Sequence, residues 1–149
     1  MTQEALLAYA HLLAILTMVV FLASQAALCR AEWMNAAVVE RLCRLDLIYA
    51  VAAGAVFLTG LARVFAGVKG APWYGMQPLL HLKLAMFVIV AVLSIQPSRC
   101  FRRWRDALRS TGELPVAQQV QQVRRRVMLQ AHLVALIPLA AVFLARGFG

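Results

Sequence analysis

Charged side chains are scarce in this chain: Asp, Glu, Lys and Arg make up only 14% of its 149 residues. Soluble globular domains carry about 25%. Hydrophobic residues account for 63% of the chain, and its mean hydropathy is +0.77. So few polar groups could not cover a soluble core of this size, and so apolar a composition excludes intrinsic disorder. The composition therefore predicts a membrane protein.

Motifs that carry enzyme chemistry are missing as well. The sequence contains no Gly-rich phosphate loop, no Ser/His/Asp arrangement and no HExxH segment. Acidic residues are few, with 6 Asp and Glu against 15 Lys and Arg, which gives a net charge of +9. In a soluble protein that surplus would suggest nucleic acid, whereas in a membrane protein it reports which loops stay in the cytoplasm.

The main feature of the sequence is a set of long apolar runs. Four runs approach the 20 or so residues that a transmembrane helix needs, at about 5–28, 47–66, 78–95 and 127–145. The runs are continuous rather than alternating, so they predict helices and not strands of a barrel. The first run is longer than the apolar region of a signal peptide and follows no positive charge, so we expect it to be retained. We therefore predict an all-α, integral membrane four-helix bundle, forming one domain over 1–149.

Basic residues predict the orientation of these helices. With four spans, the segments 30–44 and 97–126 lie on one side, and they carry 11 of the 15 basic residues. The positive-inside rule places them in the cytoplasm of a bacterial inner membrane. Both termini and the loop 67–77 then face outward, into the periplasm. In that loop, Trp73 and Tyr74 are typical of an interfacial anchor or of a lid over an outward-facing pocket.

The long cytoplasmic segment has two parts. Arginines alternate with Phe101 and Trp104 between Arg99 and Arg109, which predicts an amphipathic stretch lying on anionic lipid rather than a nucleic-acid site. The stretch 113–126 is expected to extend the fourth helix. The three cysteines (Cys29, Cys43 and Cys100) fall near this side, where a reducing cytoplasm keeps thiols free. Their odd number and the absence of CxxC argue against a disulfide framework and against a metal site.

Ionisable groups within membrane spans are costly and mark functional sites. Six lie in or at the ends of the predicted spans, namely His11, Asp46, Arg63, His81, Lys83 and His132. A helix rises about 1.5 Å per residue, so four of them, from three spans, share the outer third of the bundle. Asp46 and His132 lie nearer the cytoplasm. For Asp46 two interpretations stay open, an acid at the N-terminus of a helix and a member of a proton relay.

Two histidines at one depth on different helices are typical of a haem held inside a helical bundle. His11 and His81 are therefore the predicted iron ligands of haem b, and Arg63 or Lys83 could meet its propionates or an acidic substrate. His81 and Lys83 are two residues apart, however, so they point about 200° apart on a helix and cannot both face the centre of one pocket. For each histidine alone, a hydrogen-bonded interior group is the alternative, and we keep it for His132.

Several segments resemble a known family. The stretches Thr59-Gly60-Leu61-Ala62-Arg63, Leu82-Lys83-Leu84-Ala85-Met86-Phe87 and Leu93-Ser94-Ile95-Gln96-Pro97 resemble an uncharacterised bacterial family of small four-helix inner-membrane proteins, a domain of unknown function. A second resemblance is confined to two spans. Ala8-Tyr9-Ala10-His11 and Leu80-His81-Leu82-Lys83-Leu84 look like the HemJ-type protoporphyrinogen oxidases, which bind haem b. That resemblance implies haem or substrate roles for His11, His81 and Lys83.

Three functions remain open from the sequence. The first is a haem b-binding bundle that transfers electrons. The second is a HemJ-like protoporphyrinogen oxidase. The third is a non-catalytic accessory subunit, with small-residue helix faces that contact a homo-oligomer or a larger membrane complex.

Overall fold

The computed structural model describes residues 2–66 and 78–146, without the side chains of 66, 79, 140, 141, 144 and 145. The predicted outward loop, with Trp73 and Tyr74, lies outside the described residues. The elements are listed here in chain order: α1 (Thr2–Leu28), the 3-10 turn η1 (Ala31–Trp33), α2 (Ala36–Ala66), α4 (Pro78–Thr111) and α5 (Ala117–Ala145). The prediction of an all-α, four-helix chain is confirmed over this part.

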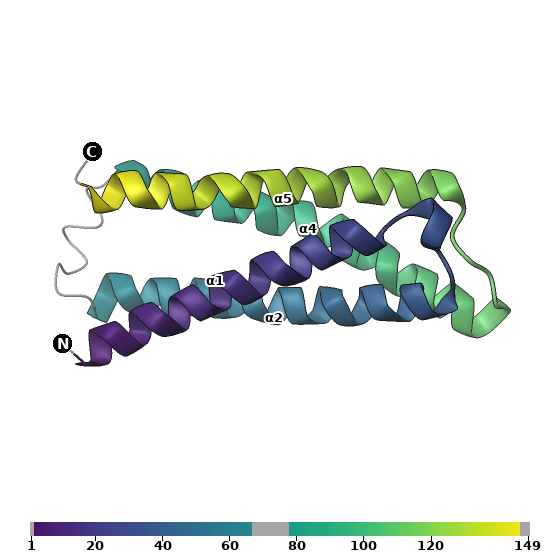
Figure 1. The fold of residues 1–149 in the computed structure, drawn as a ribbon, viewed down its shortest axis with the longest axis horizontal. Helices are drawn as coiled ribbons and strands as arrows, with labels where there is room; N and C mark the ends of the chain where they lie inside the picture. Colours follow the sequence, from purple (N-terminus) through teal and green to yellow (C-terminus); the bar gives the residue numbers. More distant parts are fainter. Residues whose placement is uncertain (1, 67–77, 147–149) are drawn as a thin grey trace.

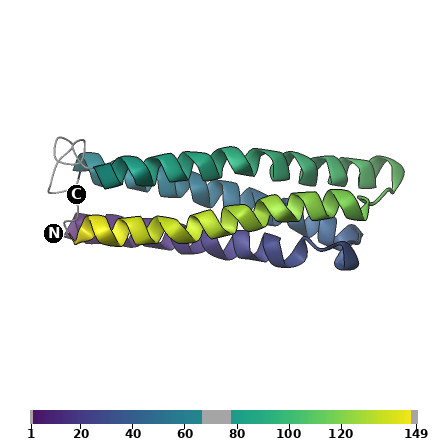
Figure 2. The ribbon, with the colours of Figure 1, turned by 90° about the horizontal axis from the view of Figure 1, so that it is seen from above.

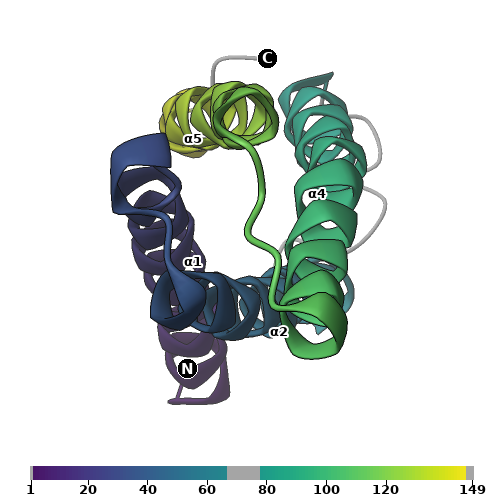
Figure 3. The same cartoon turned by 90° about the vertical axis from the view of Figure 1, so that its right-hand side faces the viewer.

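The four long helices run side by side along one axis (Figures 1 and 2). Viewed from the end, they stand around a ring in which α1 packs against α2 and α5, and α4 packs against the same two helices (Figure 3). Helix α1 begins and α5 ends at the same end of the bundle, which we call the termini end (Figure 1). The opposite end holds η1 and the connection 112–116, and we call it the arginine-rich end.

Three of these helices are long and apolar enough to cross a membrane. They span Thr2–Leu28, Ala36–Phe65 and Leu80–Thr111, with mean hydropathies of 2.4, 1.9 and 1.8 over their best windows. Within the described residues α5 is not among them. Its outer part includes four of the side chains that are not described. The structure therefore supports a helical membrane protein with three candidate spans.

The helices differ from the predicted spans mainly at the arginine-rich end. There α2 begins at Ala36 rather than near 47, and α4 continues past Pro97 to Thr111. The expected long loop 97–126 is thus mostly helix, and only 112–116 connects α4 to α5. The predicted extension of the fourth helix is confirmed from Ala117 onward. At 34 residues, α4 is about 50 Å long, well beyond the 30 Å or so of a bilayer's hydrocarbon core, so it projects past the membrane.

Local chemistry explains where these extended helices start and stop. The side chain of Asn35 caps α2, because its Oδ1 accepts the backbone N–H of Val38 at 3.0 Å. Gly112 follows the end of α4 with a φ of +74°, in the left-handed region that favours glycine, and its N–H donates to the Leu108 carbonyl. These caps define ends that hydropathy cannot detect.

The most completely buried apolar side chains gather toward the arginine-rich end. Phe101, Val120 and Val127 are 0% exposed, and the Trp104 ring packs edge-on against Phe101 with 5.6 Å between centroids. Both aromatic side chains therefore face the bundle interior, not a lipid surface as the sequence suggested. The arginines beside them on α4, Arg102 and Arg103, are exposed. The aromatic residues turn inward because α4 continues as a helix and packs against α5 and α2 at this level.

Candidate functional site

A buried histidine is the centre of the polar groups near the termini end. His11 lies on α1 and is 6% exposed, and its Nδ1 is 2.8 Å from the hydroxyl of Thr59 on α2. The Thr59 hydroxyl is also 2.6 Å from the Ala55 carbonyl oxygen, one turn earlier on α2. A polar contact thus ties α1 to α2 where most neighbouring side chains are apolar.

The hydrogen bonds at Thr59 determine which imidazole nitrogen of His11 carries the proton. A carbonyl can only accept, so the short contact with Ala55 uses the single hydroxyl proton of Thr59. The bond to His11 must then be donated by Nδ1–H, with the Thr59 oxygen as acceptor. The Val56 carbonyl is a further acceptor close to the imidazole. The neutral imidazole therefore keeps its free lone pair on Nε2, which is the atom that would bind a metal.

Gly60 is what allows the imidazole to lie so close to α2. A Cβ added to Gly60 would be 3.4 Å from His11 Cε1. That distance is contact for a methyl group, and any larger side chain would have to displace the ring. This glycine therefore permits a close approach between α1 and α2, and the neighbour it admits is His11.

Two cations complete this group of side chains. Lys83 on α4 and Arg63 on α2 both lie within electrostatic range of His11, and they lie within range of each other. Lys83 is half-buried and Arg63 is exposed. We call His11, Thr59, Arg63 and Lys83 the histidine cluster. The cluster includes residues from three helices, and it combines one imidazole lone pair with two positive charges. Such a combination suits an anionic ligand that contains a metal ion, because the imidazole nitrogen could coordinate the metal.

His81 is placed differently from the other predicted site residues. It is exposed on α4, and it is two residues from Lys83, so its side chain leaves the helix about 200° away from that lysine. Since Lys83 is the one within electrostatic range of His11, we infer that His81 projects from another face of α4. The histidine cluster thus offers one imidazole, from His11, that could hold haem iron, together with two cations that could meet its carboxylates. His81 lies apart from these groups.

Asp46 belongs to a separate polar contact, between α2 and α4. It is 6% exposed, the Ser98 hydroxyl donates to its Oδ1 at 2.7 Å, and Arg102 is within electrostatic range. Because α2 begins at Ala36, Asp46 lies about three turns inside the helix. The interpretation as a helix N-terminal acid was therefore wrong, and its cause was the predicted start of the helix near 47. A proton relay stays a prediction.

The other residues considered from the sequence are His132 and the three cysteines. His132 is exposed, so the interior position predicted for it was wrong, although its Nδ1 is 2.6 Å from the carbonyl of Met128 on its own helix. Cys29, Cys43 and Cys100 are free thiols. Among the described residues, no three His, Cys, Asp or Glu side chains are close enough to hold a metal ion.

Thr59 is the functional residue that sequence reasoning missed. It stands beside Gly60 in a quoted motif, but a threonine in a membrane helix normally bonds its own preceding turn. The pairing with a histidine 48 positions away depends on how α1 crosses α2. A threonine next to a glycine, at the depth of an intramembrane histidine, is the only sequence feature that pointed to it.

The fold and the histidine cluster define a small helical membrane protein with a polar site between its helices. The chain belongs to the family DUF2214, described as a predicted membrane protein, whose model matches residues 3–149. No curated protein and no solved structure matches the chain. The resemblance to a family of unknown function is thereby confirmed.

Proposed function

We propose that this protein is a bacterial inner-membrane bundle that binds haem b at the histidine cluster and transfers electrons. Four spans are proposed, with the apolar part of α5 as the fourth. The arginine-rich end is proposed to face the cytoplasm, since it carries most of the basic residues. The histidine cluster then lies toward the outer surface.

The observation that carries the haem proposal is the chain of hydrogen bonds from His11 through Thr59 to the Ala55 carbonyl. Histidines that bind metals usually donate their other N–H to an acceptor that fixes the ring and its tautomer. Thr59 supplies that acceptor and leaves Nε2 of a buried imidazole free.

The charges near His11 support an anionic cofactor. Arg63 and Lys83 would hold two carboxylates of a haem by charge-assisted hydrogen bonds. Bound haem would supply one-electron redox chemistry. The chain's own residues would orient the ligand and exclude water, because apolar side chains surround the cluster on α1 and α2. His81 is proposed as a second residue that would hold the iron, although its side chain leaves α4 from another face than Lys83.

The absorption spectrum of the full-length protein, purified after haem-replete expression, tests this proposal. We expect a Soret band that His11→Ala abolishes and that His132→Ala, the matched control on α5, leaves unchanged. A wild-type protein without a Soret band, or a band that survives His11→Ala, would refute it. A change of spin state in His81→Ala supports the second-ligand role, and an unchanged spectrum contradicts it.

A second candidate function is a HemJ-like protoporphyrinogen oxidase. The observation in its favour is that His11 and Lys83, two residues that the resemblance points to, lie within electrostatic range of each other. Expression in a strain that lacks porphyrinogen oxidase activity tests it. Rescue by the intact protein, lost in Lys83→Gln, supports the oxidase. Haem binding without rescue leaves electron transfer as the function.

A further inference from the structure

A groove of about 290 Å³ lies between α1 and α2, near the arginine-rich end. It is lined by Ser24, Ala27 and Leu28 of α1 and by Arg41 and Leu45 of α2. Residues three or four positions apart share one face of a helix, so each helix presents a continuous stripe to the groove. None of these residues belongs to the histidine cluster, and the groove is therefore independent of the proposed haem site.

The two ends of the groove differ in depth. Because α1 and α2 are antiparallel (Figure 1), Ser24 and Leu45 lie at the end that faces the apolar spans, and Leu28 and Arg41 lie at the outer end. Leu28 is the last residue of the predicted first span, and Arg41 lies about 9 Å before the predicted start of the second. Lipid headgroups occupy roughly 6 Å beyond the hydrocarbon core. The groove therefore leads from the acyl chains of a bilayer into its headgroup layer.

Arg41 is the polar group that the groove offers to a ligand. The Ser24 hydroxyl is bonded within α1, where it donates to the Val20 carbonyl at 2.8 Å. Arg41 is exposed and forms no ion pair with any residue that the structure describes. Its neighbour in the chain, Glu40, accepts hydrogen bonds from Arg109 through both carboxylate oxygens. The groove thus carries a positive charge without a counter-ion.

The rest of the groove suits an acyl chain. Ala27, Leu28 and Leu45 supply apolar walls. Beyond the end that faces the spans, exposed apolar side chains such as Val20 and Ile48 continue along the same helices. None of the five lining residues carries a carboxylate that could receive the ammonium of a zwitterionic headgroup. The complement of the groove is therefore an apolar chain that ends in a net negative headgroup.

We propose that this groove binds an anionic phospholipid, with the phosphate on Arg41 and one acyl chain between α1 and α2. A guanidinium group binds phosphate through charge-assisted hydrogen bonds. Lipid tails are as apolar as the walls of the groove, so contact with an acyl chain alone gives little preference for one lipid over another. The charge on Arg41 accounts for the selectivity between headgroups.

Native mass spectrometry of the full-length protein in a neutral detergent tests this proposal, because it resolves each bound lipid. The probes are phosphatidylglycerol, phosphatidylethanolamine and phosphatidylcholine with identical acyl chains. We expect phosphatidylglycerol to bind about tenfold more tightly than the other two, as a charge-assisted bond allows. It should also raise the unfolding temperature more than they do. Equal affinities for the three lipids would overturn the proposal.

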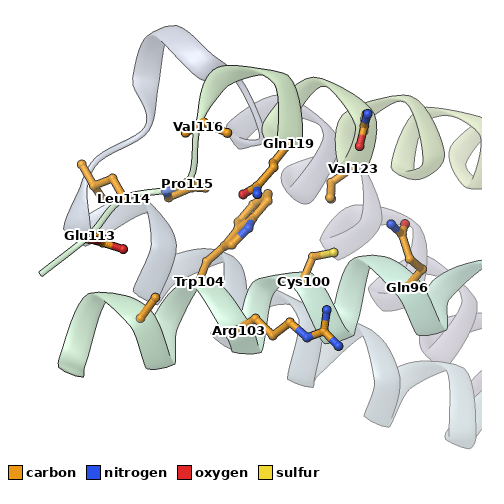
Figure 4. Close-up of a pocket in the computed structure, with 12 residues that line it drawn as sticks. Gln96, Cys100, Arg103, Trp104, Glu113, Leu114, Pro115, Val116, Gln119 and Val123 are labelled. Atoms are coloured by element: carbon orange, nitrogen blue, oxygen red, sulfur yellow. The ribbon is translucent and has the colours of Figure 1, made fainter. Parts of the chain in front are cut away.

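A control for the general basic surface comes from the other side of the bundle. A cavity of about 430 Å³ lies there between α4 and α5, with Trp104 and Val123 in its wall. In Figure 4, Arg103 extends from α4 away from α5. Arg103 is exposed, as Arg41 is, but it does not line the groove between α1 and α2. Its loss removes the same charge without touching the proposed site.

Two pairs of variants locate the bound lipid. Arg41→Gln should weaken the binding of phosphatidylglycerol about tenfold, whereas Arg103→Gln should change it by less than about twofold. Ala27→Trp places an indole in the groove and should prevent binding there whatever the headgroup. Ala23→Trp is its control, because Ala23 is exposed about one turn earlier on α1 and does not line the groove.

Losses in Arg41→Gln and Ala27→Trp, with neither control affected, support the proposal. Equal losses in Arg41→Gln and Arg103→Gln would assign binding to the basic surface as a whole and overturn it. Unchanged binding in Ala27→Trp would show that the lipid lies elsewhere, and would overturn it as well.

Discussion

Replacing Thr59 by valine isolates the hydrogen bond on which the histidine cluster depends. Valine keeps the shape of threonine but removes the oxygen that accepts from His11 Nδ1–H at 2.8 Å. A buried donor left without an acceptor costs about 1–3 kcal/mol. We therefore expect Thr59→Val to lower the free energy of unfolding by about 1–3 kcal/mol.

Two control variants make this measurement specific. Thr17→Val removes a hydroxyl that bonds only one turn back, to Leu13 on α1, so it should have little effect on stability. Thr59→Ser keeps the oxygen and should stay close to wild type. Reversible unfolding in mixed detergent micelles gives the three free energies.

The same variant tests the imidazole tautomer. In ¹⁵N-labelled wild-type protein the His11 ring should carry its proton on Nδ1, and in Thr59→Val both tautomers should be populated. Haem affinity, if haem binds, should fall by about 10- to 100-fold, as for other groups that orient metal ligands. Equal stabilities of Thr59→Val and Thr17→Val, or a wild-type ring protonated on Nε2, would refute the reasoning.

Three further predictions concern packing and thiol chemistry. Gly60→Ala should be tolerated, because its Cβ would touch His11 at contact distance, whereas Gly60→Leu should displace the ring and destabilise the α1–α2 pair, as thermal unfolding would show. Phe101→Ala should cost about 3–5 kcal/mol, since a fully buried ring is lost; a loss below about 1 kcal/mol would contradict the core placed at this end. Burial raises the pKa of the Cys29 thiol from 9.0 to about 12, so at pH 8 it should be alkylated roughly a thousandfold more slowly than an ordinary thiol. Its rate should rise about tenfold per pH unit through pH 10, because the thiolate fraction keeps growing below the pKa; a plateau near pH 9, read by peptide mass spectrometry, would contradict this.

Hydropathy predicted the end of a helix correctly where the apolar run extends to that end. The predicted ends at 28 and 145 and the predicted start at 78 agree with α1, α5 and α4. At the arginine-rich end hydropathy stopped at the first charges, although the helices continue. Arginine is a good helix former and remains solvated on a helix outside the membrane, so charge there marks the edge of the bilayer and not the end of a helix.

Part of the candidate site could be predicted from the sequence. The depth of His11, Arg63 and Lys83 could be estimated from residue counts, and in the structure both cations lie within electrostatic range of His11. The same counting placed His81 with them, because depth says nothing about which face of a helix a side chain leaves. The spacing of two residues from Lys83 was the only sequence feature that pointed to a different face.

What the sequence by itself determined is the class of protein. Apolar runs of membrane-spanning length, few charges and a one-sided distribution of arginine follow from composition and order alone, since the cost of moving a side chain into lipid depends chiefly on its own chemistry. The tertiary structure decided which polar groups meet. The crossing of α1 over α2 brings Thr59 to His11, and the junction of α4 and α5 brings Trp104 and Val123 to the wall of one cavity. Such contacts depend on the rotation and crossing of packed helices, which side-chain packing at every level of the bundle sets together.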